Sequence, residues 1–270
     1  MTIPHPAPMP FYVRILGCGS AKPSMRHNPS SQAVVYGSRV MLVDCGEGTQ
    51  LQMERLGVRL SRVTDVFLSH LHADHFLGLP GLLNTMIMNG RKEPVRIHTT
   101  EEGARLLRAV LDVISPGTEI ADFRVYDPER HGTILEDGEM KVETVPLHHR
   151  VPCCGFVFRE KTAAGVMSGR SYAYCSDTAY SEDVARAVGP VSLLYHEATY
   201  GAEDADKAAA RGHSTAEEAG RIARLAGAGG LVIGHYSMKI CDEEALAREA
   251  QGEFGGPTVA AREGMTIDIL

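Results

Sequence analysis

The chain has 270 residues, a net charge of −7 and 44% hydrophobic residues, an ordinary balance for a globular protein long enough to bury a core. The acidity argues against a protein that binds nucleic acid through a broad basic face. No run approaches the roughly 20 apolar residues of a membrane span, and the first ten residues, with four prolines, lack the apolar core of a signal peptide. We expect a cytoplasmic protein whose six cysteines are reduced.

Strand-like and helical segments alternate along the chain. Runs rich in β-branched and aromatic residues predict strands at 11–18, 33–36, 40–44, 63–69, 95–99, 140–147, 155–159, 171–176, 191–195, 230–234 and 265–270. Helical periodicity predicts helices at 48–56, 75–88, 101–113, 181–188, 216–225 and 243–249. A capping box, formed by Ser214 with Glu217 or by Thr215 with Glu218, marks the start of the helix at 216–225. This mixture, with no linker or repeat, predicts an α/β sandwich in one domain over residues 1–270.

A histidine-rich motif lies between the strand predicted at 63–69 and the following helix. It reads His70-Leu-His72-Ala-Asp74-His75 and brings three imidazoles and a carboxylate close together. Neutral imidazole and carboxylate are the usual ligands of a zinc ion that keeps an open coordination position. His70 and His72 are two residues apart, so they face the same way in extended backbone. The alternative, a solvated surface loop, is disfavoured because matching ligand types occur elsewhere in the chain.

Those further residues are His149, Asp177 and His235, each of which follows a predicted strand. Active sites of open α/β sheets gather at the carboxyl ends of the strands, so we expect all three to meet the histidine-rich motif. His148 is an alternative to His149, and the spacing alone does not separate them.

The order His-x-His-x-Asp-His, then His, Asp and His, resembles the metallo-β-lactamase superfamily. More narrowly, the chain resembles the ribonuclease Z family, endonucleases that trim the 3′ end of precursor tRNA. The matching segments run in order through most of the chain, and they are Asn28–Ser31, Asp44–Gln50, Phe76–Leu83, His196–Thr199 and His213–Thr215. The resemblance implies a four-layer αββα sandwich, and it implies a homodimer.

The resemblance also implies a set of site residues. His70, His72 and His149 would hold one Zn²⁺, whereas Asp74, His75 and His235 would hold a second, with Asp177 bridging the two; Mn²⁺ and Fe²⁺ are alternatives. His149 is preferred to His148 because the residues that follow it keep the register of the family. Asp44 is expected either to orient a ligand histidine or the histidine-rich turn, or to be an ordinary turn residue at a strand end.

The resemblance implies a reaction in which a hydroxide shared by two ions attacks phosphorus. His213 would donate a proton to the leaving oxygen, and Glu197 would keep His213 charged. Asp74 is counted as catalytic as well as metal-binding, and His196 is interpreted as structural. If His213 and Glu197 do not have these roles, they are a residue at a helix cap and a charge at a strand end.

We therefore expect a zinc-dependent phosphodiester hydrolase, with precursor tRNA among its candidate substrates. The alternative is a small-molecule metallo-hydrolase that acts on a cyclic nucleotide, a sulfate ester or a lactone. Members of the family carry a long arm that grips tRNA between the third metal motif and the bridging aspartate. Here residues 150–176 predict only two strands joined by a turn at Thr162–Gly165. The pairing of Glu197 with His213 favours a phosphodiester, because an alkoxide leaving group benefits from a proton donor.

Overall fold

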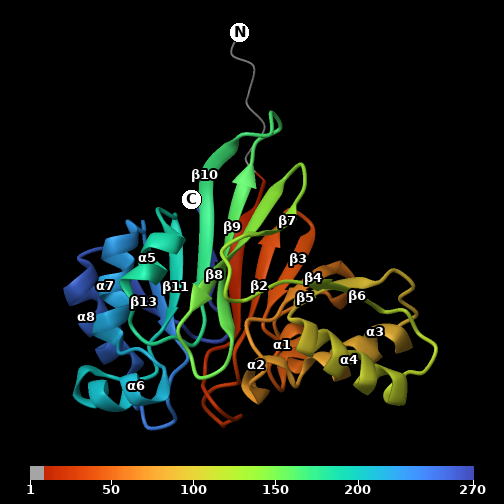
Figure 1. The fold of residues 1–270 in the computed structure, drawn as a ribbon, viewed down its shortest axis with the longest axis horizontal. Coiled ribbons are helices and arrows are strands. Elements are labelled where there is room, and N and C mark those ends of the chain that lie inside the picture. Colours follow the sequence, from red (N-terminus) through yellow and green to blue (C-terminus); the bar gives the residue numbers. More distant parts are fainter. Residues whose placement is uncertain (1–8) are drawn as a thin grey trace.

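Two seven-stranded β-sheets pack against each other in the computed structural model, which describes residues 9–270 (Figure 1). In spatial order the first sheet contains β14 (Thr266–Asp268), β1 (Phe11–Gly17), β2 (Ser31–Tyr36), β3 (Arg39–Val43), β4 (Val63–Phe67), β5 (Val95–Thr99) and β6 (Ala121–Val125). The second contains β13 (Thr258–Ala260), β12 (Leu231–Gly234), β11 (Leu193–Glu197), β10 (Met167–Cys175), β9 (Cys153–Lys161), β8 (Met140–Leu147) and β7 (Thr133–Glu136). Residues 1–8, in the segment predicted not to be a signal peptide, lie outside the described residues.

Helices cover the outer face of each sheet, which gives the predicted αββα sandwich (Figure 1). The first sheet is covered by α1 (Thr49–Arg55), α3 (Leu79–Met88) and α4 (Glu101–Ile114), and the second by α5 (Glu182–Val188), α7 (Ala216–Ala226) and α8 (Glu243–Phe254). Shorter helical segments lie in the connections: η1 (Leu60–Arg62), α2 (Ala73–Phe76), η2 (Ala202–Asp204) and α6 (Ala205–Arg211). Within residues 9–270 no helix is both long and apolar enough to cross a membrane.

Alternation along the central strands explains the layers. In β3, Met41 and Val43 point into the apolar cluster between the sheets, whereas Val40 and Leu42 belong to the cluster beneath α1 and α3. Successive strand residues point to opposite faces, so a continuous apolar run such as this one is buried on both sides.

Strand direction brings the candidate residues to one edge. Strands β3 to β6 are parallel to one another, and so are β10 to β13. Strand β8 is antiparallel to β9, which is antiparallel to β10, so β8 and β10 run in the same direction. The loops after β4, β8, β10 and β12 therefore provide residues for a common site.

The structure differs from the sequence prediction in several elements. The helix predicted at 75–88 is divided into α2 and α3 at Gly78, where an added Cβ would lie 2.1 Å from the Gly46 carbonyl oxygen. Pro80 follows, and proline is favoured at the start of a helix because it lacks the N–H of an interior residue. Strands β6, β7 and β13 and helix α6 were not predicted; the strands are edge or near-edge strands that are short or half exposed. Of the two capping boxes, the structure forms the one of Thr215 with Glu218.

Candidate active site

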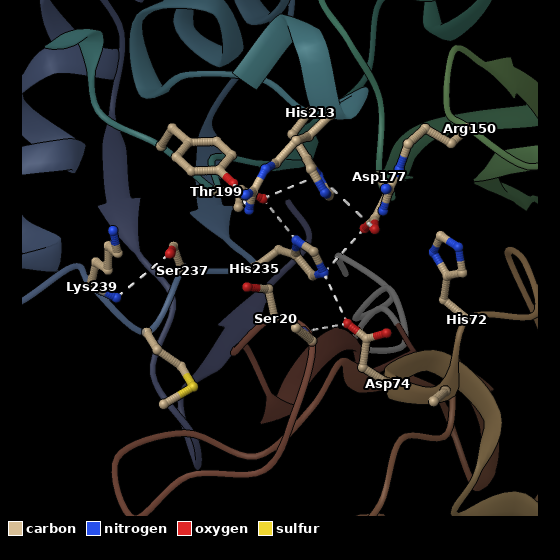
Figure 2. A pocket seen from close by; sticks show the side chains of 15 residues that line it. Ser20, His72, Asp74, Arg150, Asp177, Thr199, His213, His235, Ser237 and Lys239 are labelled. Carbon is tan, nitrogen blue, oxygen red and sulfur yellow. Dashed lines mark hydrogen bonds and ion pairs between the residues drawn. The ribbon is translucent and has the colours of Figure 1, made fainter. Parts of the chain in front are cut away.

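The structure brings all seven predicted metal ligands together, at the carboxyl ends of the strands. Figure 2 shows four of them, His72, Asp74, Asp177 and His235, where they line a cavity. They form two groups in which the candidate ligand atoms of each group lie within 4.8 Å of one another. The first group is His70, His72, His149 and Asp177, and the second is Asp74, His75 and His235. These residues come from the loops after four different strands, so the site exists only in the folded chain.

In the first group, His70 Nε2 and His149 Nε2 lie 3.1 and 3.2 Å from Nδ1 of His72. Oδ2 of Asp177 completes the group at 3.7 Å from both of these Nε2 atoms. All four atoms therefore face one small volume.

In the second group, Oδ1 of Asp177 lies 3.4 Å from His75 Nε2 and 3.1 Å from His235 Nε2. Oδ2 of Asp74 lies 3.6 and 3.5 Å from the same two nitrogens. The two oxygens of Asp177 thus face different groups, as a bridging carboxylate would require.

The donor set fits divalent metal ions. His75 Nε2, His235 Nε2 and Asp177 Oδ1 are buried, and none of them has a hydrogen-bond partner of acceptable geometry among the described residues. Leaving buried polar atoms unpaired is costly, so such a group indicates a missing binding partner. Bonds of about 2.0–2.1 Å at a tetrahedral angle separate two ligand atoms by about 3.4 Å, close to the distances found here.

Neighbouring groups fix the orientation of the ligand histidines. His75 donates from Nδ1 to Asp44 at 2.7 Å, and His149 donates from Nδ1 to the Gly212 carbonyl at 2.7 Å. Because a carboxylate and a carbonyl only accept, each Nδ1 carries a proton, and Nε2 is the nitrogen that faces the site and is available to a metal ion. Nδ1 of His235 lies 2.8 Å from Thr199 Oγ1 in the same manner.

Asp44 contacts both a ligand histidine and the residue before the histidine-rich turn, the two features that the sequence suggested it would orient. Besides His75, its carboxylate accepts from the backbone N–H of Ser69 at 2.8 Å and from the Tyr174 hydroxyl at 2.7 Å. Ser69 precedes the histidine-rich turn, and Tyr174 belongs to the second sheet. The carboxylate therefore joins the two sheets directly beneath the site, rather than being an ordinary turn residue.

His213 and Glu197 form a pair at the edge of the metal-ligand groups. Nδ1 of His213 lies 2.9 Å from Oε1 of the fully buried Glu197. Burial disfavours a charged His213, but the charge of Glu197 and this hydrogen bond outweigh it and raise the pKa of His213 above its usual value. Burial likewise disfavours charge on Glu197, but the charge of His213 lowers its pKa. The pair is arranged to keep a protonated imidazole at the site.

Two other histidines have different surroundings. His148 is exposed and its backbone N–H donates to Thr178 at 3.0 Å, whereas His149 faces the site. His196 is fully buried, and its Nδ1 lies 2.7 Å from the Glu197 carbonyl oxygen, which fits the structural interpretation.

A cavity of about 620 Å³ opens beside the two groups (Figure 2). Its lining includes Arg150, Arg211 and Lys239, and none of the three forms an ion pair with a carboxylate of residues 9–270. Arg211 instead donates to the Tyr200 hydroxyl at 3.3 Å. The sequence analysis did not identify these cations as site residues, because they follow no ligand motif and lie in separate segments of the chain, with Arg211 at the end of α6. They make one part of an acidic protein attractive to an anion.

The chain is similar to known proteins in both sequence and fold. The family described as the Beta-lactamase superfamily domain matches residues 39–236. Proteins named Ribonuclease Z from Parabacteroides distasonis and Porphyromonas gingivalis are 38% and 37% identical to the chain, each match covering 96% of it and 99% of the relative. The crystal structure of the short form of human tRNase Z superposes with a TM-score of 0.80 at 27% identity, covering 96% of this chain and 99% of that one. A metallo-β-lactamase fold protein from Bacillus subtilis, 22% identical, has a TM-score of 0.81, with 96% and 99% coverage, and shares the fold.

Proposed function

Because the chain belongs to the ribonuclease Z family of the metallo-β-lactamase superfamily, and is thus a metal-dependent phosphodiester hydrolase, we propose that it is a zinc-dependent endonuclease that processes the 3′ end of precursor tRNA. The observation that carries the proposal is the pair of ligand groups sharing Asp177, placed next to the Glu197–His213 pair and a cation-lined cavity. In this proposal, the ligand groups and the cavity cations would bind the phosphate, and the Glu197–His213 pair would serve its leaving group.

Seven residues would hold two Zn²⁺ ions. His70, His72 and His149 would bind the first, Asp74, His75 and His235 would bind the second, and the two oxygens of Asp177, which face different groups, would be shared between them. Bound ions of this kind supply an activated water and neutralise charge on the phosphoryl oxygens. Mn²⁺ and Fe²⁺ accept the same histidine and carboxylate donors and are alternatives to zinc.

The residues around the metal centre orient the substrate and move a proton. His213 is held through Nδ1 by Glu197, which leaves Nε2 to donate a proton to the leaving oxygen. Asp74 has a catalytic role as well as a metal-binding one. Its Oδ2 accepts a hydrogen bond from the backbone N–H of Ala21 at 2.6 Å, and the carboxylate faces both ligand histidines of the second group. Arg150 and Arg211 lie on the cavity wall, where they would bind phosphates of the substrate.

The alternative function, hydrolysis of a small phosphodiester, is favoured by one observation. Strands β9 and β10 are joined by a tight turn in which the Thr162 N–H donates to the Val166 carbonyl at 2.7 Å, so no long arm interrupts them. The alignment with the Parabacteroides relative spans 303 positions, more than the 270 residues of this chain, so that relative has residues without a counterpart here. A substrate that contacts the protein only at the cavity is compatible with either function.

A paired assay tests the proposal. The zinc-loaded protein is incubated with a precursor tRNA and, separately, with bis(p-nitrophenyl) phosphate, and kcat/KM is measured for both. We expect cleavage of the tRNA on the 3′ side of the acceptor stem, with a higher kcat/KM than for the small ester. Activity on the small ester alone would favour the alternative function. Size-exclusion chromatography with light scattering would test the homodimer that the resemblance implies.

A further inference from the structure

A second cluster of metal-ligand side chains lies outside the catalytic centre. It consists of Cys18 directly after β1, His27 in the loop before β2, and Glu263 in the turn before β14. Their ligand atoms lie within 4.8 Å of one another. Cys18 is fully buried, whereas the side chains of His27 and Glu263 are 16% and 17% exposed, so a cation can reach the cluster from solvent.

The distances in the cluster are compatible with a shared metal ion. Sγ of Cys18 lies 3.5 Å from Nδ1 of His27, and the same nitrogen lies 3.2 Å from Oε2 of Glu263. A tetrahedral Zn²⁺, with Zn–S of about 2.3 Å and Zn–N and Zn–O of about 2.0–2.2 Å, places sulfur and nitrogen about 3.5 Å apart and nitrogen and oxygen about 3.4 Å apart. A thiolate, an imidazole and a carboxylate together are a donor set that suits zinc.

The neighbours of the cluster orient its ligands. Oε1 of Glu243 lies 3.1 Å from Nε2 of His27, so this carboxylate can accept a hydrogen bond from a protonated Nε2. The lone pair of Nδ1 would then face Cys18 and Glu263. The backbone N–H of Asn28 donates to Oε1 of Glu263 at 2.9 Å, which leaves Oε2 on the side of His27. A carboxylate behind a ligand imidazole is the usual arrangement around protein-bound zinc.

We propose that Cys18, His27 and Glu263 form an additional Zn²⁺ site, distinct from the catalytic centre. The competing explanation is a protonated His27 that bridges Glu243 and Glu263 with no metal. Burial and the nearby charge of Glu263 raise the pKa of the Cys18 thiol well above its usual value, so the carboxylate disfavours a thiolate until a cation joins them. A zinc ion would hold Cys18 as the thiolate and displace the proton from Nδ1 of His27.

The site would anchor a loop that touches the catalytic centre. The segment between Cys18 and His27 contains Ser20, which lines the catalytic cavity, and Ala21, whose N–H donates to Asp74. Closing this segment with a metal would limit its motion and so hold Asp74 in place. The additional ion therefore has a structural role, and the proposal does not depend on which phosphodiester is cleaved.

Cobalt substitution gives a specific test, because the seven catalytic ligands include no cysteine. The metal-free protein is loaded with Co²⁺, and the near-ultraviolet thiolate-to-cobalt charge-transfer band is recorded. We expect the band in the wild-type protein, its loss in Cys18→Ser, and its retention in Cys241→Ser, in which the exposed Cys241 thiol is removed instead. Absence of the band from folded, cobalt-loaded wild-type protein would overturn the proposal.

Metal content provides the second measurement. Mass spectrometry of zinc-loaded protein should show one fewer ion per chain in Cys18→Ser and in His27→Gln than in wild type or Cys241→Ser. His27→Gln keeps the proposal testable if Cys18→Ser does not fold, since His27 is partly exposed. Equal zinc content in wild type and in both variants would show that His27 is only an ion-pair partner of the two glutamates.

Discussion

Nδ1 of His75 lies 2.7 Å from Oδ2 of Asp44, and both side chains are fully buried. The carboxylate also accepts hydrogen bonds from Ser69 and Tyr174, so its two oxygens accept from all three neighbouring residues. Asparagine has the same shape but only one accepting oxygen, and its amide group would face a donor.

We therefore predict that Asp44→Asn weakens metal binding at the second ligand group by about 10–100-fold, the usual effect of losing a partner of a ligand histidine. Competition with a chromogenic chelator measures the affinity. Tyr174→Phe is the matched control, since it removes one donor to Asp44 and leaves His75 held. Equal affinities in wild type and Asp44→Asn would show that the orientation of His75 does not depend on this contact.

Asp177→Ala and His213→Ala should separate metal binding from proton transfer. Asp177 contacts both ligand groups, so its removal should release metal and abolish activity together. His213 contacts Glu197 and the cavity, so its removal should leave the metal content unchanged and lower kcat by about 100-fold or more. Metal analysis and kcat are measured on the same preparations, and full activity of His213→Ala would exclude it as the proton donor.

Glu197→Gln should change the pH dependence of kcat/KM. Glu197 helps to raise the pKa of His213, and a proton donor is active only while protonated, so activity falls as the pH rises through that pKa. Removing the negative charge lowers the pKa, and the alkaline limb of the profile should therefore move to lower pH. The profile is recorded at saturating metal for both proteins. An alkaline limb at the same pH in both would show that the titration of His213 does not produce it.

The sequence was sufficient to place the metal-ligand candidates but not the cavity around them. His149, Asp177 and His235 could be placed because each follows a predicted strand, and active sites of open α/β sheets gather at the carboxyl ends of the strands. Arg150 and Arg211 could not be placed, because no motif or periodicity distinguishes these charged residues from solvated ones. Helix α6, which ends at Arg211, was missed because its alanine-rich sequence has no large apolar residue to mark a buried face.

Arg150 and Arg211 should contribute to substrate binding rather than to chemistry. Both line the cavity without a carboxylate partner in the described part of the chain, so they are free to contact phosphates. The double variant Arg150→Ala/Arg211→Ala should raise KM for precursor tRNA about 10-fold, with little change in kcat. It should also reduce the slope of log KM against log salt by about 1 for each phosphate that the variant no longer neutralises.

Arg105→Ala is the control, since Arg105 is an exposed cation on α4 outside the cavity. If Arg105→Ala and the double variant have the same KM and salt dependence, the cavity cations have no specific role.

Asp65 should make folding sensitive to acid independently of the catalytic centre. Its fully buried carboxylate lies 2.9 Å from Arg39, 2.8 Å from Arg96 and 2.9 Å from His98. Burial raises the pKa of Asp65, but the hydrogen bonds from His98 and Arg96 and the charge of Arg39 outweigh it and hold the pKa well below its usual range. A depressed carboxylate pKa stabilises the fold above the unfolded value of about 3.9, and this stabilisation is lost as the pH falls through the folded value.

Asp65→Asn should lower the free energy of unfolding by about 3 kcal/mol at pH 7, because it leaves the largely buried Arg39 with only the half-exposed Asp137 as a charged partner. The difference from wild type should shrink by about 1 kcal/mol at pH 3, where part of the same contribution is already absent from wild type. Urea denaturation of chelator-treated proteins measures both values without a contribution from metal release. Asp122→Asn, at a half-exposed carboxylate that pairs with Arg124 on the same strand, β6, should change stability by less than about 1 kcal/mol at either pH. A difference between wild type and Asp65→Asn that stays constant from pH 7 to pH 3 would show that Asp65 does not titrate differently in the folded and unfolded chains.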